Sequence, residues 1–210
     1  MVKIMLLIKK KKLKVIVGCE ESQIVCMSFR ARGHEAYSCD IEKCSGGHPE
    51  WHIQDDILNH LDDGWDLGIF HPPCTYIANS GARWLFEKVG RWKQLDDACE
   101  FFKQLLNAPI PKKCVENPIP HKWGVERIGI KYTQKVQPYN FGDKQKKGIC
   151  LWLINLPPLV PTTPELKPPK DKIELKKWEM IWRMPPGNNQ AKLRSKTFPG
   201  IAGAFAKQWG

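Results

Sequence analysis

Apolar and polar residues alternate along the first half of the chain in blocks that predict strands and helices in turn. Residues 13–18 (LKVIVG) are mostly β-branched and predict a strand, and residues 23–32 carry apolar side chains on one helix face. Gly33 is typical of the end of such a helix, and residues 35–39 (EAYSC) predict a second strand that leads to Asp40. This order is the start of a βαβ pattern.

The same alternation continues to about residue 118. A weak strand precedes residue 55, a clearer one covers 65–70, a helix covers 91–106, and a short strand covers 112–115 before Glu116. Strands that alternate with helices predict a mostly parallel, doubly wound sheet of the Rossmann-like α/β class. Such sheets bind ligands beyond the carboxyl ends of their strands. The residues expected to meet there are Gly18 to Glu21, Asp40, Asp56, Cys74 and Glu116.

The pattern changes after residue 135. The predicted elements are two strands at 135–139 and 148–154 that suit a hairpin, a proline-rich loop at 156–169, a short helix at 173–183, a turn at 185–189 and a last helix at 199–209. We expect one domain over residues 13–210, preceded by a basic extension, 1–12, and containing a small irregular insertion, 143–194.

The net charge of +11 favours a polyanionic partner such as nucleic acid, although part of the excess is the lysine run at 9–12, which is equally typical of a solvated tail. The eight cysteines include no CxxC pair, and no secretory signal is present, so reduced thiols and a cytoplasmic location are expected. The apolar segment 4–8 is too short to span a membrane. We therefore expect no membrane association.

Two short motifs carry candidate chemistry. His71-Pro72-Pro73-Cys74 follows a buried strand, and the two prolines restrict the backbone so that Cys74 is presented at the rim of the sheet. Taken alone, Cys74 is equally typical of a buried thiol, and His71 of a structural histidine. The second motif, residues 114–118 (CVENP), places Glu116 after the next strand. A thiol and a carboxyl group on neighbouring strand ends suit attack on an electron-poor ring, in which the acid binds the ring nitrogen.

These motifs resemble those of the DNA cytosine-5 methyltransferases, and in particular a compact phage and prophage branch of that superfamily. Pro73-Cys74 is similar to the family's nucleophile motif, and Glu116-Asn117 to the motif whose glutamate contacts N3 and the amino group of cytosine. Gly81 stands where the family has a mobile-loop glycine, and the tail from Arg194 to Ala202 is similar to the terminal motif of the phage branch.

The resemblance implies a methyltransferase that uses S-adenosylmethionine, acts on DNA and needs no metal. The catalytic residues it implies are Cys74, Glu116, Asn117 and Arg83. The residues it implies for the cofactor are Gly18, Cys19, Glu20, Glu21, Asp40, Ile41, Asp56, Ile57, His71, Pro72 and Ala202, and those for the substrate are Pro73, Thr75, Ser80, Gly81 and Gln134. An acid about twenty residues after a glycine turn also suits ribose binding in any Rossmann-like site.

The chain departs from the family in two places. Residues 133–137 (TQKVQ) occupy the position of a Gln-x-Arg-x-Arg motif but contain no arginine, and Arg83 is a candidate substitute. The large target-recognition domain is also absent, because only about fifty residues separate Gly142 from Arg194. A protein partner that supplies target recognition is one way to make up for this.

Other functions remain open. HPPC also resembles the motif with which amino-group methyltransferases grip an exocyclic amine, a free pyrimidine nucleotide could replace DNA, and an inert nucleic-acid-binding protein would need no chemistry. Trp84, Trp92 and Trp123 are candidates for stacking on bases, with packing as the alternative. Cofactor binding and a covalent adduct would discriminate among these functions.

Overall fold

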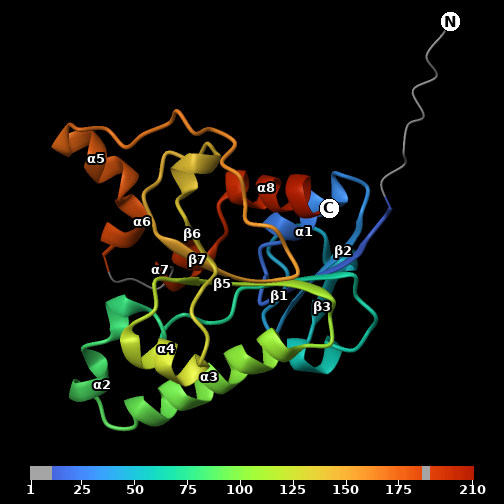
Figure 1. Ribbon diagram of the computed structural model, residues 1–210, viewed down its shortest axis with the longest axis horizontal. Helices are drawn as coiled ribbons and strands as arrows, with labels where there is room; N and C mark the ends of the chain where they lie inside the picture. Colours follow the sequence, from blue (N-terminus) through green and yellow to red (C-terminus); the bar gives the residue numbers. More distant parts are fainter. Residues whose placement is uncertain (1–10, 186–189) are drawn as a thin grey trace, which may run out of the picture.

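A seven-stranded sheet runs through the middle of the computed structural model, which describes residues 11–185 and 190–210 (Figure 1). Its strands lie in the order β3-β2-β1-β4-β5-β7-β6. Their bounds are Lys14–Gly18 for β1, Glu35–Asp40 for β2, His52–Gln54 for β3, Leu67–Phe70 for β4, Lys112–Pro118 for β5, Gln134–Val136 for β6 and Ile149–Ile154 for β7. The first five strands are parallel, and β7 runs antiparallel to both β5 and β6. The predicted doubly wound, Rossmann-like fold class is confirmed.

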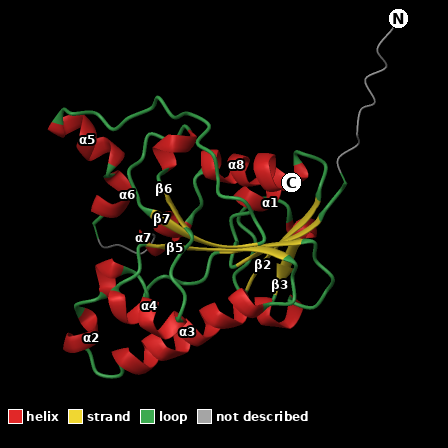
Figure 2. Ribbon diagram, viewed as in Figure 1, coloured by secondary structure: helices red, strands yellow, loops and turns green. Residues whose placement is uncertain are grey.

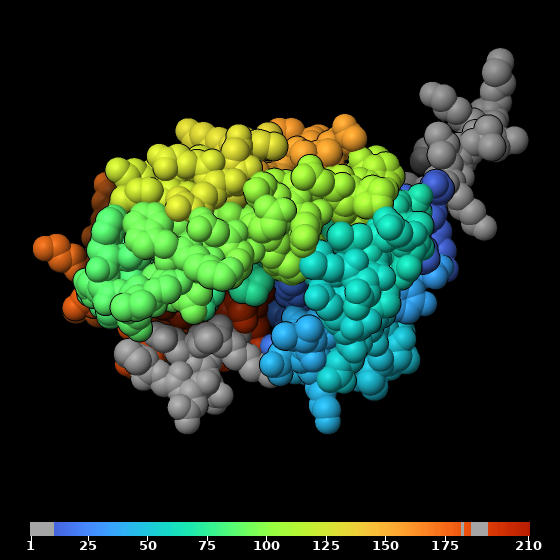
Figure 3. Space-filling model, turned by 90° about the horizontal axis from the view of Figure 1, so that it is seen from below, coloured from blue at the N-terminus to red at the C-terminus, as the bar shows by residue number. Residues whose placement is uncertain are grey.

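Helices cover both faces of this sheet (Figure 2). One face carries α1 (Ile24–Arg30) and α8 (Pro199–Trp209), and the other carries α3 (Arg91–Asn107), α4 (Lys122–Ile128) and the single turn α2 (Trp84–Glu87). Seen from the α3 side, residues of α2 and α3 spread over one face and lie beside those of α4 (Figure 3). The short helices α5 (Lys172–Trp178), α6 (Met180–Arg183) and α7 (Gln190–Ser195) lie beyond the β6 edge. No described helix is long and apolar enough to cross a membrane.

The central strands are buried on both faces, which explains their unbroken apolar sequences. Residues 15–18 of β1 and all four residues of β4 are buried. Alternate residues of each strand join one of two cores: Val15 and Val17 pack on the α1 and α8 side, and Ile16 packs on the α3 side. The N-terminus of α8 is held by Asp143, whose carboxylate accepts a hydrogen bond from Gly200 N at 3.0 Å.

The structure confirms most predicted elements and corrects three of them. The strand predicted to end before Glu116 continues through Pro118, because β7 pairs with it along that length. Residues 138 and 139, expected at the end of a strand, belong to a 3₁₀ turn over Pro138–Phe141, and the helix expected at 173–183 is split in two at Glu179. The apolar segment 4–8, lysines 9 and 10, and residues 186–189 of the predicted turn lie outside the described residues.

Candidate active site

The carboxyl ends of the parallel strands meet at one edge of the sheet, as the sequence predicts. Gly18, the last residue of β1, pairs with Phe70 at the end of β4, and its carbonyl accepts a hydrogen bond from His71 N at 3.0 Å. On the other side, Glu20 N donates to Cys39 O of β2 at 3.3 Å. The loops that follow β1 and β4 are therefore hydrogen-bonded to the neighbouring strands β2 and β1.

The loop with the HPPC motif is fixed to β5 at two points. His71 Nδ1 lies 3.0 Å from Glu116 Oε2, and the two side chains are only 6% and 16% exposed. Asn117, which is fully buried, donates from Nδ2 to Pro72 O at 3.1 Å. Glu116 and Asn117 are consecutive in β5, and each holds one of two consecutive residues of the loop. The nucleophile candidate and the acid candidate thus belong to one rigid unit.

Cys74 lies at the end of this fixed segment and is half-buried. Its carbonyl accepts hydrogen bonds from Ile77 N and Ala78 N, which closes the turn that begins the next segment. Burial raises the pKa of the Cys74 thiol, and the positive charges of Lys147 and Arg194 partly offset that rise. A nearby cation therefore increases the fraction of Cys74 that is present as the reactive thiolate.

The turn after β1 is built differently from a glycine-rich loop. Cys19 has the left-handed backbone φ of 59°, and Glu20 turns inward, where it is only 4% exposed. Its carboxylate accepts hydrogen bonds from Val25 N at 2.6 Å and Cys26 N at 3.2 Å, so it occupies the N-terminus of α1. Burial raises the pKa of Glu20 to about 7, against the opposing influence of nearby His71. This internal carboxylate is a feature that the sequence did not reveal.

Gly18 is required by packing. A Cβ atom added to it would lie 2.7 Å from side-chain atoms of Ile57 and Phe70. Ile57, predicted to contact the cofactor, is accordingly buried beneath this turn. Glu21 is half-buried and forms a hydrogen bond with Ser45.

The end of β2 presents a polar and an apolar group together. Asp40 is half-buried, accepts a hydrogen bond from Glu42 N at 2.9 Å, and has its pKa raised by burial. Ile41 beside it is 71% exposed, which is unusual for a side chain of its size. A carboxylate for ribose hydroxyls next to an apolar surface for a flat ring suits a nucleoside.

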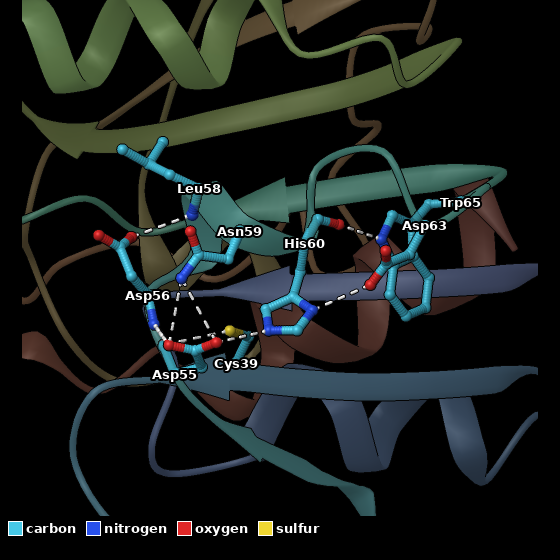
Figure 4. Close-up of polar contacts among 8 residues, drawn as sticks. All are labelled: Cys39, Asp55, Asp56, Leu58, Asn59, His60, Asp63 and Trp65. Carbon is cyan, nitrogen blue, oxygen red and sulfur yellow. Dashed lines mark hydrogen bonds and ion pairs between the residues drawn. The ribbon is translucent and has the colours of Figure 1, made fainter.

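The segment after β3 distinguishes Asp55 from Asp56 (Figure 4). Asp55 accepts hydrogen bonds from Asp56 N and Asn59 Nδ2, and its carboxylate lies 3.1 Å from His60 Nε2. The pKa of Asp55 is lowered, and the hydrogen bond from Asp56 N is the largest cause. Asp56 is exposed, points away from this cluster and caps the next turn through Leu58 N at 3.0 Å. Asp55 therefore shapes the loop, and Asp56 faces outward, where a ligand could reach it.

The residues predicted to contact the substrate differ in how accessible they are. Pro73, Thr75 and Ser80 are exposed, and Gly81 lies where a Cβ atom would come within 2.9 Å of Thr75 O. Gln134, by contrast, uses both ends of its amide on the backbone of Leu159, at 2.8 Å each. That contact gives Gln134 a structural part in fixing the proline-rich loop.

Aromatic side chains gather next to the Cys74 loop on α2, α3 and α4. Phe86, Trp92 and Trp123 meet edge to face, with centroid distances of 5.2–5.8 Å. Trp84 contacts two cations instead, with Arg83 lying 4.2 Å over its ring. Trp92 and Trp123 are therefore packed together, and Arg83 is stacked on its neighbour.

The structure brings Lys147, which the sequence did not single out, together with the tail residues 195–198. A pocket next to Glu116 is lined by Lys147 and by residues 195–198, which precede α8. Lys147 Nζ donates to Arg194 O at 2.9 Å and lies 5.7 Å over the ring of Phe198. Ala202, predicted from the tail motif, is buried in α8. For Lys147 itself the sequence signal is the cluster of lysines at 144–147, which resembles an ordinary charged loop.

The chain has a weak structural match among known proteins. No family model matches the chain, and no curated protein matches it. Among solved structures, one match is a protein encoded within an E. coli prophage and provisionally described as a DNA modification methyltransferase. It has 12% sequence identity and a TM-score of 0.41 over 68% of this chain and 46% of that chain, so this chain spans less than half of its length. The fold class therefore rests on the strand order and register given above.

Proposed function

We propose that this chain is an S-adenosylmethionine-dependent methyltransferase that methylates carbon 5 of cytosine in DNA through a covalent bond to Cys74. The observation that carries the proposal is the double attachment of the HPPC loop to β5, through His71 to Glu116 and through Asn117 to Pro72. This attachment keeps a thiol and a carboxyl group on one rigid edge of the sheet. Such an arrangement suits a reaction in which the thiol adds to carbon 6 of a pyrimidine while the carboxyl group binds N3.

The proposed reaction begins with addition of the Cys74 thiolate to carbon 6 of the ring. The addition delocalises negative charge onto carbon 5 and N3, and the carboxyl O–H of Glu116 donates a hydrogen bond to N3 and stabilises that charge. After carbon 5 has taken the methyl group, a base such as water removes the proton from carbon 5, the electron pair of that C–H bond re-forms the double bond to carbon 6, and Cys74 leaves as the thiolate. His71 orients Glu116, since its Nδ1 contacts one carboxylate oxygen and leaves the other for the ring.

The described residues fit the cofactor that this reaction needs. Asp40 and exposed Ile41 suit its ribose and adenine, and Asp56 is an exposed acid on the adjacent segment. His71 Nε2 is buried without a hydrogen-bond partner among the described residues, so it is a further polar atom that a ligand could satisfy. When bound, S-adenosylmethionine supplies an electrophilic methyl group on sulfur.

The proposed substrate is DNA because the chain carries a net charge of +11 and the pocket is lined by basic residues. A stacked base does not expose carbon 6 to a thiolate, so the target cytosine has to be flipped out of the helix. Duplex DNA of mixed sequence is the appropriate first probe.

The test is intact-mass spectrometry of the protein after incubation with S-adenosylmethionine and mixed-sequence duplexes that contain 5-fluorocytosine. Fluorine at carbon 5 cannot leave as a proton does, so the covalent product is trapped. We expect an adduct with the wild type and with Cys44→Ser, a control at another half-buried cysteine, and none with Cys74→Ser.

Other results would overturn the proposal. Cofactor binding without an adduct, with methylation that survives Cys74→Ser, would indicate amino-group methylation. An adduct with 5-fluoro-dCMP but not with DNA would indicate a nucleotide substrate. Absence of both cofactor binding and adduct would indicate an inert binding protein.

A further inference from the structure

The pocket beside Glu116 combines three kinds of surface. Glu116 supplies a carboxyl group to the lining, and Ile149, Phe198 and Ile201 supply its apolar part. The remaining lining is cationic and hydroxylic: Lys147, Ser195, Lys196 and Thr197. An ammonium group and a hydroxyl group are typical partners of phosphate oxygens, whereas the ring edge of a base suits Glu116.

Lys147 differs from its neighbour Lys146 in the group that its ammonium contacts. Lys146 Nζ lies 3.3 Å from Glu179 Oε1, so its charge is paired. Lys147 Nζ donates to the carbonyl of Arg194 at 2.9 Å, and no carboxylate pairs with it among residues 11–185 and 190–210. An ammonium group has three N–H donors, so this contact orients Lys147 and leaves donors for a ligand. The side chain is half-buried, which strengthens its electrostatic effect.

The charge of the surrounding sequence points the same way. Positions 143 to 196 hold twelve lysines and arginines but only five aspartates and glutamates, so this stretch carries most of the net charge of +11. The pocket lies where this basic stretch meets the carboxyl end of β5. Anions are therefore attracted to the entrance next to Glu116.

We infer that Lys147, with Lys196 and the hydroxyl groups of Ser195 and Thr197, binds the phosphate attached to the pyrimidine nucleoside whose base faces Glu116. The inference rests on the proposed function and names the substrate group that positions the target base. A phosphate held by these residues would fix the nucleotide after its base has left the helix, because a flipped-out base has lost its stacking and pairing neighbours. The same phosphate group belongs to free dCMP as a monoester and to DNA as a diester.

The experiment measures how well ligands protect Cys74 from alkylation, without S-adenosylmethionine. His71 and Asn117 join the loop that carries Cys74 to β5, and Glu116 of β5 lines the pocket, so a nucleotide whose base faces Glu116 should shield Cys74 under the proposed function. Peptide mass spectrometry after a short exposure to N-ethylmaleimide reports Cys74 separately from the other cysteines. The probes are deoxycytidine, dCMP and a mixed-sequence DNA duplex.

For the wild type we expect dCMP or the duplex to protect at concentrations roughly tenfold lower than deoxycytidine, as the gain of a charge-assisted hydrogen bond suggests. Lys147→Gln should remove that advantage, and Lys147→Arg should restore part of it. Lys144→Gln, which removes an exposed lysine three positions away, is the matched control and should leave protection unchanged. Protection by dCMP would identify the monoester as a ligand, and protection by the duplex alone would identify the diester.

Equal protection by all three probes, or equal effects of Lys147→Gln and Lys144→Gln, would overturn the inference. Thermal melting of each variant separates a loss of binding from a loss of folding. The proposed function is tested separately, because phosphate-dependent protection without a covalent 5-fluorocytosine adduct would refute cytosine methylation and leave the phosphate site standing.

Discussion

Glu20→Gln tests whether the buried carboxyl group at the N-terminus of α1 costs the protein stability at neutral pH. The pKa of Glu20 is raised from 4.5 to about 7, because burial disfavours the charged form more than the hydrogen bonds from Val25 N and Cys26 N favour it. Below pH 4.5 the carboxyl is protonated in both the folded and the unfolded state. As the pH rises toward 7, the unfolded state ionises first, so the free energy of unfolding falls, by about 3 kcal/mol in total.

Glutamine cannot ionise, and its one oxygen can still accept from Val25 N. The lost acceptor for Cys26 N should cost about 1 kcal/mol at every pH. We therefore expect the variant to be slightly less stable than the wild type at pH 4.5 and about 2 kcal/mol more stable at pH 8.

The assay is urea unfolding of both proteins at intervals between pH 4.5 and 8, followed by tryptophan fluorescence. Glu126→Gln, on an exposed part of α4, controls for the loss of one negative charge. If the difference in unfolding free energy between the wild type and Glu20→Gln stays constant over this range, folding does not raise the pKa of Glu20 and the reasoning is refuted.

Two further substitutions test the packing of the site. Gly18→Ala should lower the free energy of unfolding by about 1–3 kcal/mol, because the new methyl group would press on Ile57, whereas Gly203→Ala, which has open space, should be neutral or stabilising. Equal urea midpoints for the two variants would contradict the packing described. Asn117→Asp should lower the free energy of unfolding by about 3 kcal/mol, because it buries a charge next to Pro72 O. It should also reduce the yield of the 5-fluorocytosine adduct. An aspartate variant as stable as the wild type at pH 8 would show that this hydrogen bond does not hold the loop.

The strands were predictable because their side chains obey a local rule. β1 and β4 are buried on both faces, so nearly every residue in them is apolar, and the sequence predicts their positions within two residues. α4 was missed because it is short and contains Gly124, which ordinarily weakens a helix. In the structure, His121 compensates by accepting a hydrogen bond from Gly124 N at 2.9 Å.

The candidate site was only partly predictable, because its contacts join distant segments. Parallel strand order places Cys74 and Glu116 at one edge, and that followed from the sequence pattern alone. The contact of His71 with Glu116 spans 45 residues, and that of Lys147 with Arg194 spans 47. Such contacts depend on strand order, on register and on the path of α8, none of which a local pattern contains.

The position of α8 has a consequence for the order in which the candidate site is completed during synthesis. Cys74 and Glu116 leave the ribosome well before residues 195–201, which form the wall of the pocket and pack α8 against the sheet. A nascent chain therefore contains both candidate groups before the residues that complete the pocket beside Glu116 have been made. Glu116 thus acquires this part of its surroundings late in folding.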